Sequence, residues 1–137
     1  MQKVKLNLQT KGLRNTKGRS DVLKVLEDEK VPVDVSHIQQ HLDEKAVRVD
    51  PATVYRILDA FYKNGIVQRF DFQEGKFRYE IASKQDHHHL ICESCGSIED
   101  ISDCNIKELE KEIGKKKGFL VKRHSLEFFG LCKDCQG

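Results

Sequence analysis

The sequence predicts an α+β protein made of two small domains. Apolar side chains recur at helical spacing in the first 65 residues, and two β-rich runs follow over residues 66–81. The second half holds two Cys-x-x-Cys pairs. A chain of 137 residues suits one ordinary domain, or two small ones that need an additional stabilising element.

Three helices are predicted in the first half. The first spans residues 16–28, where Thr16 is a good N-cap for a stretch with an apolar face. A second, short helix begins after Asp34. The third has the clearest signature, because Asp50 is a favourable N-cap and Pro51 fits the first helical position.

Residues 66–81 predict a β-hairpin whose turn lies around Gly75. Three helices followed by a hairpin make a winged helix-turn-helix, in which the third helix is positioned to enter the major groove of DNA. The solvent face of that helix should present Ala52, Thr53, Tyr55 and Arg56. We expect Arg56 to contact a guanine edge or a phosphate, the alternative being an exposed arginine without this role.

The positive charge is concentrated in the first half. Residues 1–85 hold 16 basic and 12 acidic residues, whereas residues 86–137 hold 8 and 10. Six basic residues precede the first acidic one, Asp21: Lys3, Lys5, Lys11, Arg14, Lys17 and Arg19. Such a segment suits phosphate neutralisation, with Arg14 and Arg19 as candidate DNA contacts, although it is also common as a solvated arm.

The sequence predicts a cytoplasmic protein with no membrane partner. No stretch approaches the roughly 18 apolar residues needed to span a bilayer, and the start lacks the apolar region of a secretory signal. The cytosol keeps thiols reduced, so the five cysteines favour metal binding over disulfides.

The four paired cysteines are the strongest signal in the chain. Cys92 and Cys95 form one pair, and Cys132 and Cys135 form another after a gap of 36 residues. Two tight turns of this kind aim four thiolates at one zinc ion, which should stabilise a domain with a small core. The alternatives are separate thiols or two redox pairs. Cys104 is left over, and we expect it to be a small buried residue, the alternative being an exposed thiol.

The rest of the second half predicts short strands at HHLICES and SIEDI, an amphipathic helix over residues 105–117, and a longer strand over residues 119–130. Adjacent histidines precede the first cysteine pair. On a strand, His87 and His89 face one side and His88 the other. With carboxylates and a later histidine in the chain, this alternation suits two metal sites; the alternative is histidines that hydrogen-bond at a strand edge.

Six segments together resemble the ferric uptake regulator family of bacterial metal-sensing repressors, from about Gly12 to Cys135. They are GLRNTKGR, TVYRIL, GIV, RYEI, HHHLICESCG and HSLEFFGLCKDC, in this order. The resemblance implies a winged-helix domain over residues 1–81, a hinge over residues 82–86, and a small α/β dimerisation domain with a structural zinc over residues 87–137. It also implies a homodimer that represses genes of metal homeostasis by binding double-stranded operator DNA.

The resemblance further implies which residues bind metal. The four paired cysteines match the structural zinc ligands. A regulatory divalent ion, Fe²⁺, Zn²⁺ or Mn²⁺, is expected on Glu80, His87, His89 and Asp100. His88 and His124 match a second site.

Three positions depart from the family pattern. Lys107 stands where the second site usually has a glutamate, with Asp86 and Glu108 as nearby substitutes. Pro32 occupies the position of a sensing histidine, and His37 lies one turn further on. Gly18 replaces a usual glutamine.

Three other functions compete with a metal-responsive repressor. A zinc hydrolase would need an open site beside a general base, and the chain has no H-E-x-x-H motif and little length for a substrate pocket, so we expect no enzyme and no small-molecule substrate. A zinc-stabilised protein-interaction module would lack the basic arm and the exposed Tyr55 and Arg56. Within the family, a peroxide-sensing repressor is the remaining alternative.

Overall fold

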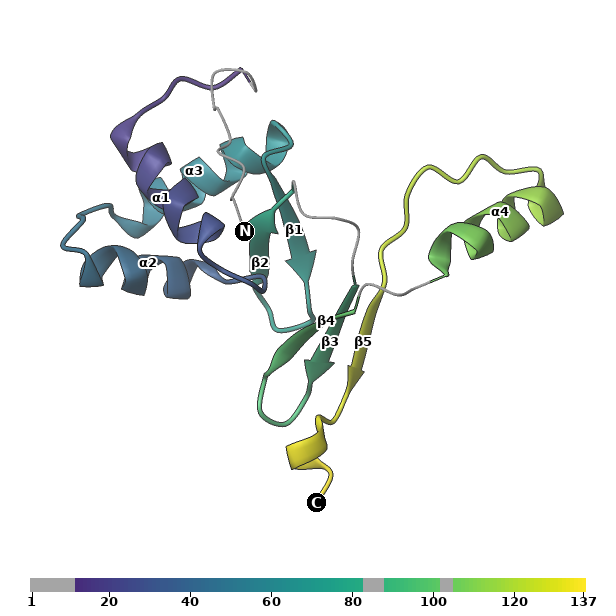
Figure 1. Ribbon diagram of the computed structural model, residues 1–137. Coiled ribbons are helices and arrows are strands. Elements are labelled where there is room, and N and C mark those ends of the chain that lie inside the picture. The colour runs from purple at the N-terminus through teal and green to yellow at the C-terminus, as the bar shows by residue number, and fades with distance from the viewer. Residues whose placement is uncertain (1–11, 83–87, 102–104) are drawn as a thin grey trace. The chain divides into compact units, whose positions relative to one another are not determined.

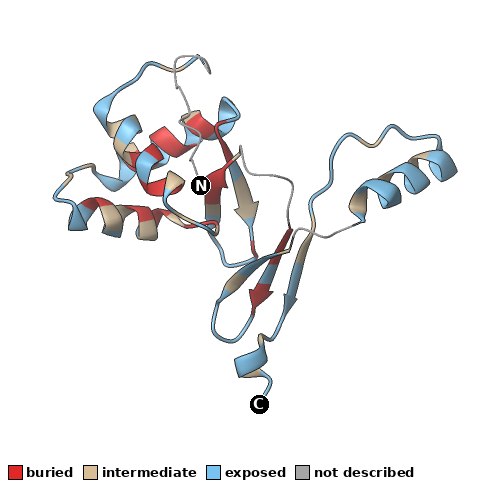
Figure 2. Cartoon of the chain, in the orientation of Figure 1, coloured by how far each residue is buried: buried red, intermediate tan, exposed pale blue. Residues whose placement is uncertain are grey.

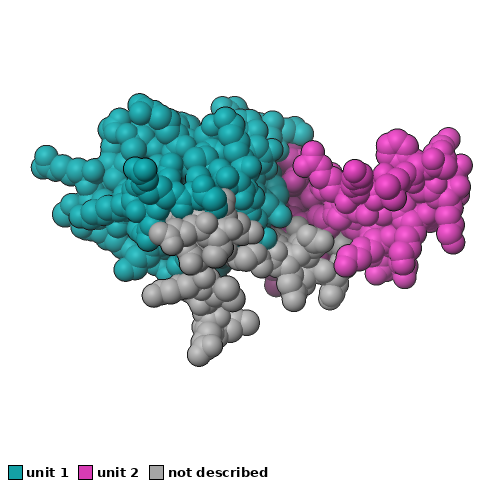
Figure 3. All heavy atoms as spheres, turned by 90° about the horizontal axis from the view of Figure 1, so that it is seen from above, with its two compact units in different colours: residues 1–84 teal, residues 85–137 magenta. Residues whose placement is uncertain are grey.

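The computed structural model describes residues 12–82, 88–101 and 105–137. The chain divides into two compact units, residues 1–84 and residues 85–137 (Figure 3). Each unit has a sheet of its own (Figure 1). Most of the expected hinge, residues 83–86, lies outside the described residues. None of the described helices is long and apolar enough to cross a membrane.

The first unit begins with three helices, α1 Lys17–Glu27, α2 Val35–Glu44 and α3 Pro51–Lys63. Thr16 caps α1, because its Oγ1 accepts a hydrogen bond from the Arg19 N–H at 3.3 Å. In the same way, Asp34 caps α2. Asp50 lies at the N-cap of α3 but makes no capping bond to the helix backbone; its carboxylate accepts a hydrogen bond from the Thr53 hydroxyl.

The predicted hairpin consists of β1 Val67–Asp71 and β2 Phe77–Ile81, paired antiparallel. The turn needs Gly75, whose φ of 80° lies in the left-handed region. An isolated bridge joins Val33, which lies between α1 and α2, to Tyr79 in β2. The hairpin is thereby attached to the helices by backbone hydrogen bonds as well as by side-chain packing.

A single apolar core holds the first unit together (Figure 2). All three helices contribute one face to it, and the hairpin contributes the inward side chains of both strands. The predicted stripe on α3 is part of this core: Val54, Ile57, Leu58 and Phe61 are all buried. Burial of this stripe turns the opposite face of α3 outward.

The second unit contains a three-stranded sheet in the order β4-β3-β5. Strand β3, His88–Cys92, is antiparallel to β4, Ile98–Ile101, and parallel to β5, Glu127–Gly130. Helix α4, Ile106–Lys117, follows β4 and has no buried residue. It ends at Lys117, as the sequence predicted, and Gly118 caps it with a φ of 60°, in the left-handed region that favours glycine. A 3-10 turn, Lys133–Cys135, completes the described elements.

The prediction of one long strand over residues 119–130 was wrong. Only Glu127–Gly130 is a strand, and residues 119–126 have no regular structure. A strand requires a neighbour for its backbone groups, and β3 pairs with β5 only from His89 to Cys92. Phe119 and Leu120 are 67% and 79% exposed, so the two apolar residues that begin the expected strand are not packed within the described part of this chain.

Candidate metal centres and nucleic-acid interface

The two cysteine pairs come together in the second unit. Cys92 ends β3 and Cys95 lies in the turn after it, while Cys132 precedes and Cys135 ends the 3-10 turn that follows β5. Because β3 and β5 are parallel neighbours, the segments that leave their carboxyl ends meet at one edge of the sheet. One sulfur atom from each cysteine lies within 4.8 Å of the others.

The sulfur geometry fits a tetrahedral metal ion. With Zn–S bonds of about 2.3 Å, the sulfurs of a tetrahedral site lie about 3.8 Å apart. The Sγ atoms of Cys95 and Cys132 are separated by 3.8 Å. The cluster can therefore close around zinc with small movements of the remaining side chains.

Local hydrogen bonds favour the thiolate form at Cys92, one of the four cysteines. The backbone N–H groups of Cys95 and Cys132 donate to the Cys92 sulfur at 3.5 Å and 3.3 Å. They lower the pKa of Cys92 to about 6. Interaction with the neighbouring Cys132 side chain instead raises the pKa of Cys135 to about 12. A divalent cation bound by the cluster would displace the thiol protons, since thiolates are the form that binds metal.

Two of the expected regulatory ligands lie side by side in the second unit. His89 in β3 is paired in register with Asp100 in β4, and its Nε2 lies 3.6 Å from the Asp100 Oδ1. The imidazole is 1% exposed, whereas the carboxylate is 39% exposed. In the first unit, Glu80 in β2 is 2% exposed. His87 lies outside the described residues.

His88 has different partners from His89, as alternation along a strand requires. Its Nδ1 lies 3.2 Å from the carbonyl oxygen of Leu126, and its Nε2 lies 3.3 Å from the Nε2 of His124. The structure thus brings together the two histidines expected for a second site. The two rings are tilted by 47° with centroids 4.9 Å apart.

Glu110 completes this group, and the sequence reasoning missed it. Its Oε1 contacts the Nδ1 of His124. The residues considered as substitutes for the glutamate missing at Lys107 were Asp86, outside the described residues, and Glu108, which is exposed. A signal was present in the sequence: Glu110 lies four residues after Ile106, on the half-buried face of α4, whereas Glu108 lies on its exposed face.

The candidate nucleic-acid interface lies on the outward face of α3. Ala52, Tyr55 and Arg56 are exposed, and the Tyr55 side chain is 56% accessible. Thr53 is half-buried, and its hydroxyl donates a hydrogen bond to the Asp50 carboxylate. Ahead of α1, Arg14 is exposed, and the guanidinium of Arg19 donates to its carbonyl oxygen at 2.9 Å.

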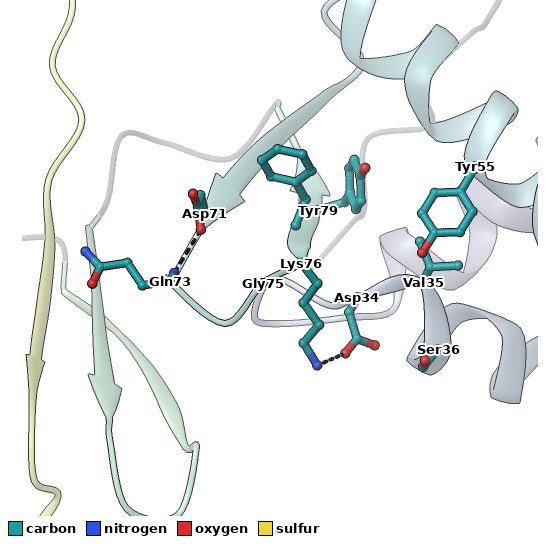
Figure 4. Close-up of a pocket in the computed structure, with 10 residues that line it drawn as sticks. Asp34, Val35, Ser36, Tyr55, Asp71, Gln73, Gly75, Lys76 and Tyr79 are labelled. Atoms are coloured by element: carbon teal, nitrogen blue, oxygen red, sulfur yellow. Dashed lines mark hydrogen bonds and ion pairs between the residues drawn. The ribbon is translucent and has the colours of Figure 1, made fainter.

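Beside this face, a hollow of about 520 Å³ lies between the start of α2, Tyr55 and the turn of the hairpin (Figure 4). Lys76 Nζ lies 2.5 Å from Asp34 Oδ2 at its rim. Further along the hairpin, the Arg69 guanidinium stands 4.1 Å from the Tyr62 ring centroid and 4.3 Å from that of Phe77. The hairpin is thus fixed to the helices by charged contacts.

Comparisons with known proteins agree over nearly the whole chain. The family model described as "Ferric uptake regulator family" matches residues 10–129. The ferric uptake regulation protein of Escherichia coli K12 is 35% identical over 132 residues, covering 94% of this chain and 89% of that protein.

Solved structures match the fold as well. The ferric uptake regulator of Vibrio cholerae has a TM-score of 0.82 and 33% identity, over 91% of this chain and 96% of that one. The regulator of Helicobacter pylori, described as having three functional metal binding sites, has a TM-score of 0.83 and 31% identity, over 95% and 87%.

Proposed function

The chain belongs to the ferric uptake regulator family of metal-responsive transcription regulators, which are not enzymes, and we propose that it is a homodimeric, cytoplasmic repressor that binds operator DNA when a divalent metal is present. The observation that carries this proposal is the combination of an outward-facing α3 with an adjacent hairpin in a winged helix-turn-helix unit. Such a unit presents one helix to the major groove of duplex DNA.

In the proposed complex, α3 supplies the contacts to bases and the basic residues supply contacts to phosphates. Arg56 has the guanidinium fork that recognises a guanine edge, and Tyr55 offers a ring and a hydroxyl. Thr53 lies near the N-terminus of α3, where recognition helices contact base edges. Arg14 and Arg19 precede or begin α1, and we assign them to the DNA backbone.

We propose that Glu80, His87, His89 and Asp100 bind the regulatory ion. Imidazole and carboxylate ligands together accept Fe²⁺, Zn²⁺ or Mn²⁺, so the donor set alone does not select one. Glu80 belongs to the first unit and the other three to the second. A shared cation would restrict the arrangement of the two units and raise the population of dimers whose two α3 helices reach successive half-sites.

Two further metal sites belong to this proposal. Zinc on Cys92, Cys95, Cys132 and Cys135 would serve as a structural ion, which the sulfur spacing supports. His88 and His124 would form a second metal-binding site, separate from the regulatory one. The contact between His124 and the Glu110 carboxylate supports Glu110 as the acidic ligand in place of Lys107.

A metal-dependent DNA titration tests this function. Zinc-loaded protein is titrated against random-sequence and selected duplex DNA under anaerobic conditions, with Fe²⁺, Mn²⁺ or Zn²⁺ added in separate buffered series. We expect one ion to sharpen sequence-specific binding at a far lower free concentration than the others. A DNA affinity that is indifferent to every ion would refute the metal switch.

The Arg56→Ala variant tests the DNA interface separately. Losing one base contact should weaken specific binding by about 1–3 kcal/mol, or roughly tenfold to a hundredfold, with zinc content unchanged. Arg123→Ala, an exposed arginine in the second unit, is the matched control and should leave affinity for operator DNA nearly unchanged. Equal binding by Arg56→Ala and the parent protein would remove Arg56 from the interface.

A further inference from the structure

The first unit contains a group of metal-ligating side chains that belongs to none of the sites described above. One ligand atom each from Glu29, His37 and His41 lies within 4.8 Å of the others. We propose that these three residues form an additional binding site for a divalent transition-metal ion in the winged-helix unit. This site lies wholly within residues 1–84 and does not depend on the proposed repressor function.

The two imidazoles converge on one carboxylate oxygen. The Nε2 of His37 lies 2.6 Å and the Nε2 of His41 lies 3.5 Å from Oε1 of Glu29. Ligand atoms bound to one tetrahedral zinc ion at about 2.1 Å lie about 3.4 Å apart. The His41 distance already fits this geometry, and the His37 contact fits after it lengthens by about 0.8 Å, which side-chain torsions can supply.

The backbone holds all three side chains in position. His37 and His41 are four residues apart on α2, so their side chains lie on one face of the helix, and the ring centroids are 4.4 Å apart. The Asp34 carboxylate fixes the start of α2 by accepting a hydrogen bond from the His37 N–H at 2.8 Å. Glu29 lies two residues after the end of α1, and its N–H donates to the carbonyl oxygen of Leu26 at 3.2 Å.

The donor set selects the class of ion. Two imidazoles and one carboxylate suit Zn²⁺, Co²⁺, Ni²⁺ or Cu²⁺, whereas Mg²⁺ and Ca²⁺ prefer oxygen ligands alone. The side chains of His37, His41 and Glu29 are 39%, 38% and 20% exposed. An ion can therefore enter from solvent, and three protein ligands leave a coordination position for water.

An ion at this position would connect the α1–α2 loop to α2, which packs against α3 in the same core. The effect would be to clamp the segment that leads into the DNA-facing helix. A simple surface ion pair between Glu29 and His37 is the competing explanation, and pairs this exposed contribute little to stability. Metal binding distinguishes the two.

The experiment is a Co²⁺ titration of the full-length protein with zinc already bound, followed by visible absorption. The His37→Ala/His41→Ala double variant is compared with the parent protein and with Gln40→Ala, which changes an exposed residue of α2 outside the cluster. We expect the double variant to bind one equivalent of Co²⁺ fewer. Any Co²⁺ that the double variant still binds at this position should bind at least about 100-fold more weakly than in the parent protein, since changes beyond the ligand shell already cost roughly 10- to 100-fold. Gln40→Ala should match the parent.

Two further measurements locate the ion. Paramagnetic Co²⁺ should broaden amide NMR signals of residues 29–41 in the parent protein. Glu29→Gln, which preserves volume, should abolish this broadening, and it replaces the double variant as the test if that variant folds poorly. Equal stoichiometry and affinity in the parent and all variants would overturn the proposal, and so would the same loss in Gln40→Ala. Because the readout is metal binding without DNA, a failed repressor function would leave this result unaffected.

Discussion

The two units solve the problem of stability in different ways. In the described part of the chain, all but two of the buried apolar residues lie in the first unit; the two exceptions are Ile91 and Cys92. Three helices and a hairpin enclose one apolar core in the first unit, whereas no residue of α4 in the second unit is fully buried (Figure 2). The first unit is therefore stabilised mainly by the hydrophobic effect, whereas the described part of the second unit buries little apolar surface, and the proposed zinc ion and dimer would supply further stability.

The exposed residues support this contrast. Phe119, Leu120 and Leu131 of the second unit are 67%, 79% and 52% accessible. Large apolar side chains at such exposure on several segments are typical of a surface that another chain covers. They support the proposed homodimer, and they explain why the second unit has so small a core of its own.

The largest effect we expect is loss of the second unit when the cysteine cluster is broken. Cys92→Ser or Cys132→Ser should remove the metal and unfold β3, β4 and β5, because binding energy at a structural zinc site is folding energy. The first unit should stay folded. Amide hydrogen exchange reports on the two units separately. The protection of backbone amides from exchange should vanish after residue 88 and persist in α1, α2 and α3. Cys104→Ser, which removes a cysteine outside the two pairs, is the control and should retain both the metal and the protection.

The second prediction concerns the opposite change, in which the core of the first unit is weakened and the cysteine cluster is left intact. Phe61→Ala deletes a fully buried ring from the core of the first unit and should cost about 3–5 kcal/mol of its unfolding free energy. All three tyrosines lie in the first unit and the chain has no tryptophan, so tyrosine fluorescence during urea unfolding reports this unit alone. Zinc content should not change. A variant that lost its zinc together with its core would show that the two units do not have separate sources of stability.

The same asymmetry explains what the sequence could and could not predict. The helices and hairpin of the first unit were predictable, because local signals such as the Thr16 cap and the stripe on α3 agree with a core made by the unit itself. The cysteine cluster was also predictable, since its spacing reflects the chemistry of one ion. The long strand over residues 119–130 was wrong because its apolar pattern reflects exposed surface instead of pairing within the chain.

The proposed metal ligands that could not be predicted from the sequence are those set by packing. Glu110 meets His124 across 14 positions of chain, and Glu29 meets His41 across 12. Neither pairing follows from a short motif, because each depends on how a helix lies against a distant segment. Helical spacing could have suggested His37 with His41, but only the position of the α1–α2 loop identifies Glu29 as their partner.

The third prediction concerns the partner of the second unit. Leu120→Ser should weaken the proposed dimer by at least about tenfold, or about 1.4 kcal/mol, because a polar residue replaces a large apolar one at the surface assigned to the interface. Analytical ultracentrifugation over a concentration series measures the shift. Tyr62→Ser, which changes an exposed aromatic residue of the first unit, should leave the dimer intact. Equal dissociation of both variants would place the interface elsewhere.

The smallest effect tests a charged contact in the first unit. Burial alone would raise the pKa of Asp34, but the hydrogen bonds from Lys76 and from the His37 N–H outweigh it and lower the pKa. Asp34 therefore stabilises the fold above its unfolded pKa of about 3.9, and this contribution disappears as the pH falls through the lower folded value. Lys76→Gln should cost up to about 1 kcal/mol at pH 7, and this cost should shrink at acidic pH as the pH falls through the lowered folded pKa of Asp34. Tyrosine-detected urea unfolding at pH 7 and at acidic pH measures this difference, and Lys63→Gln, from a more exposed pair with Asp59, should change less. A cost for Lys76→Gln that is the same at both pH values would mean that Lys76 stabilises the hairpin by packing and not through the Asp34 charge.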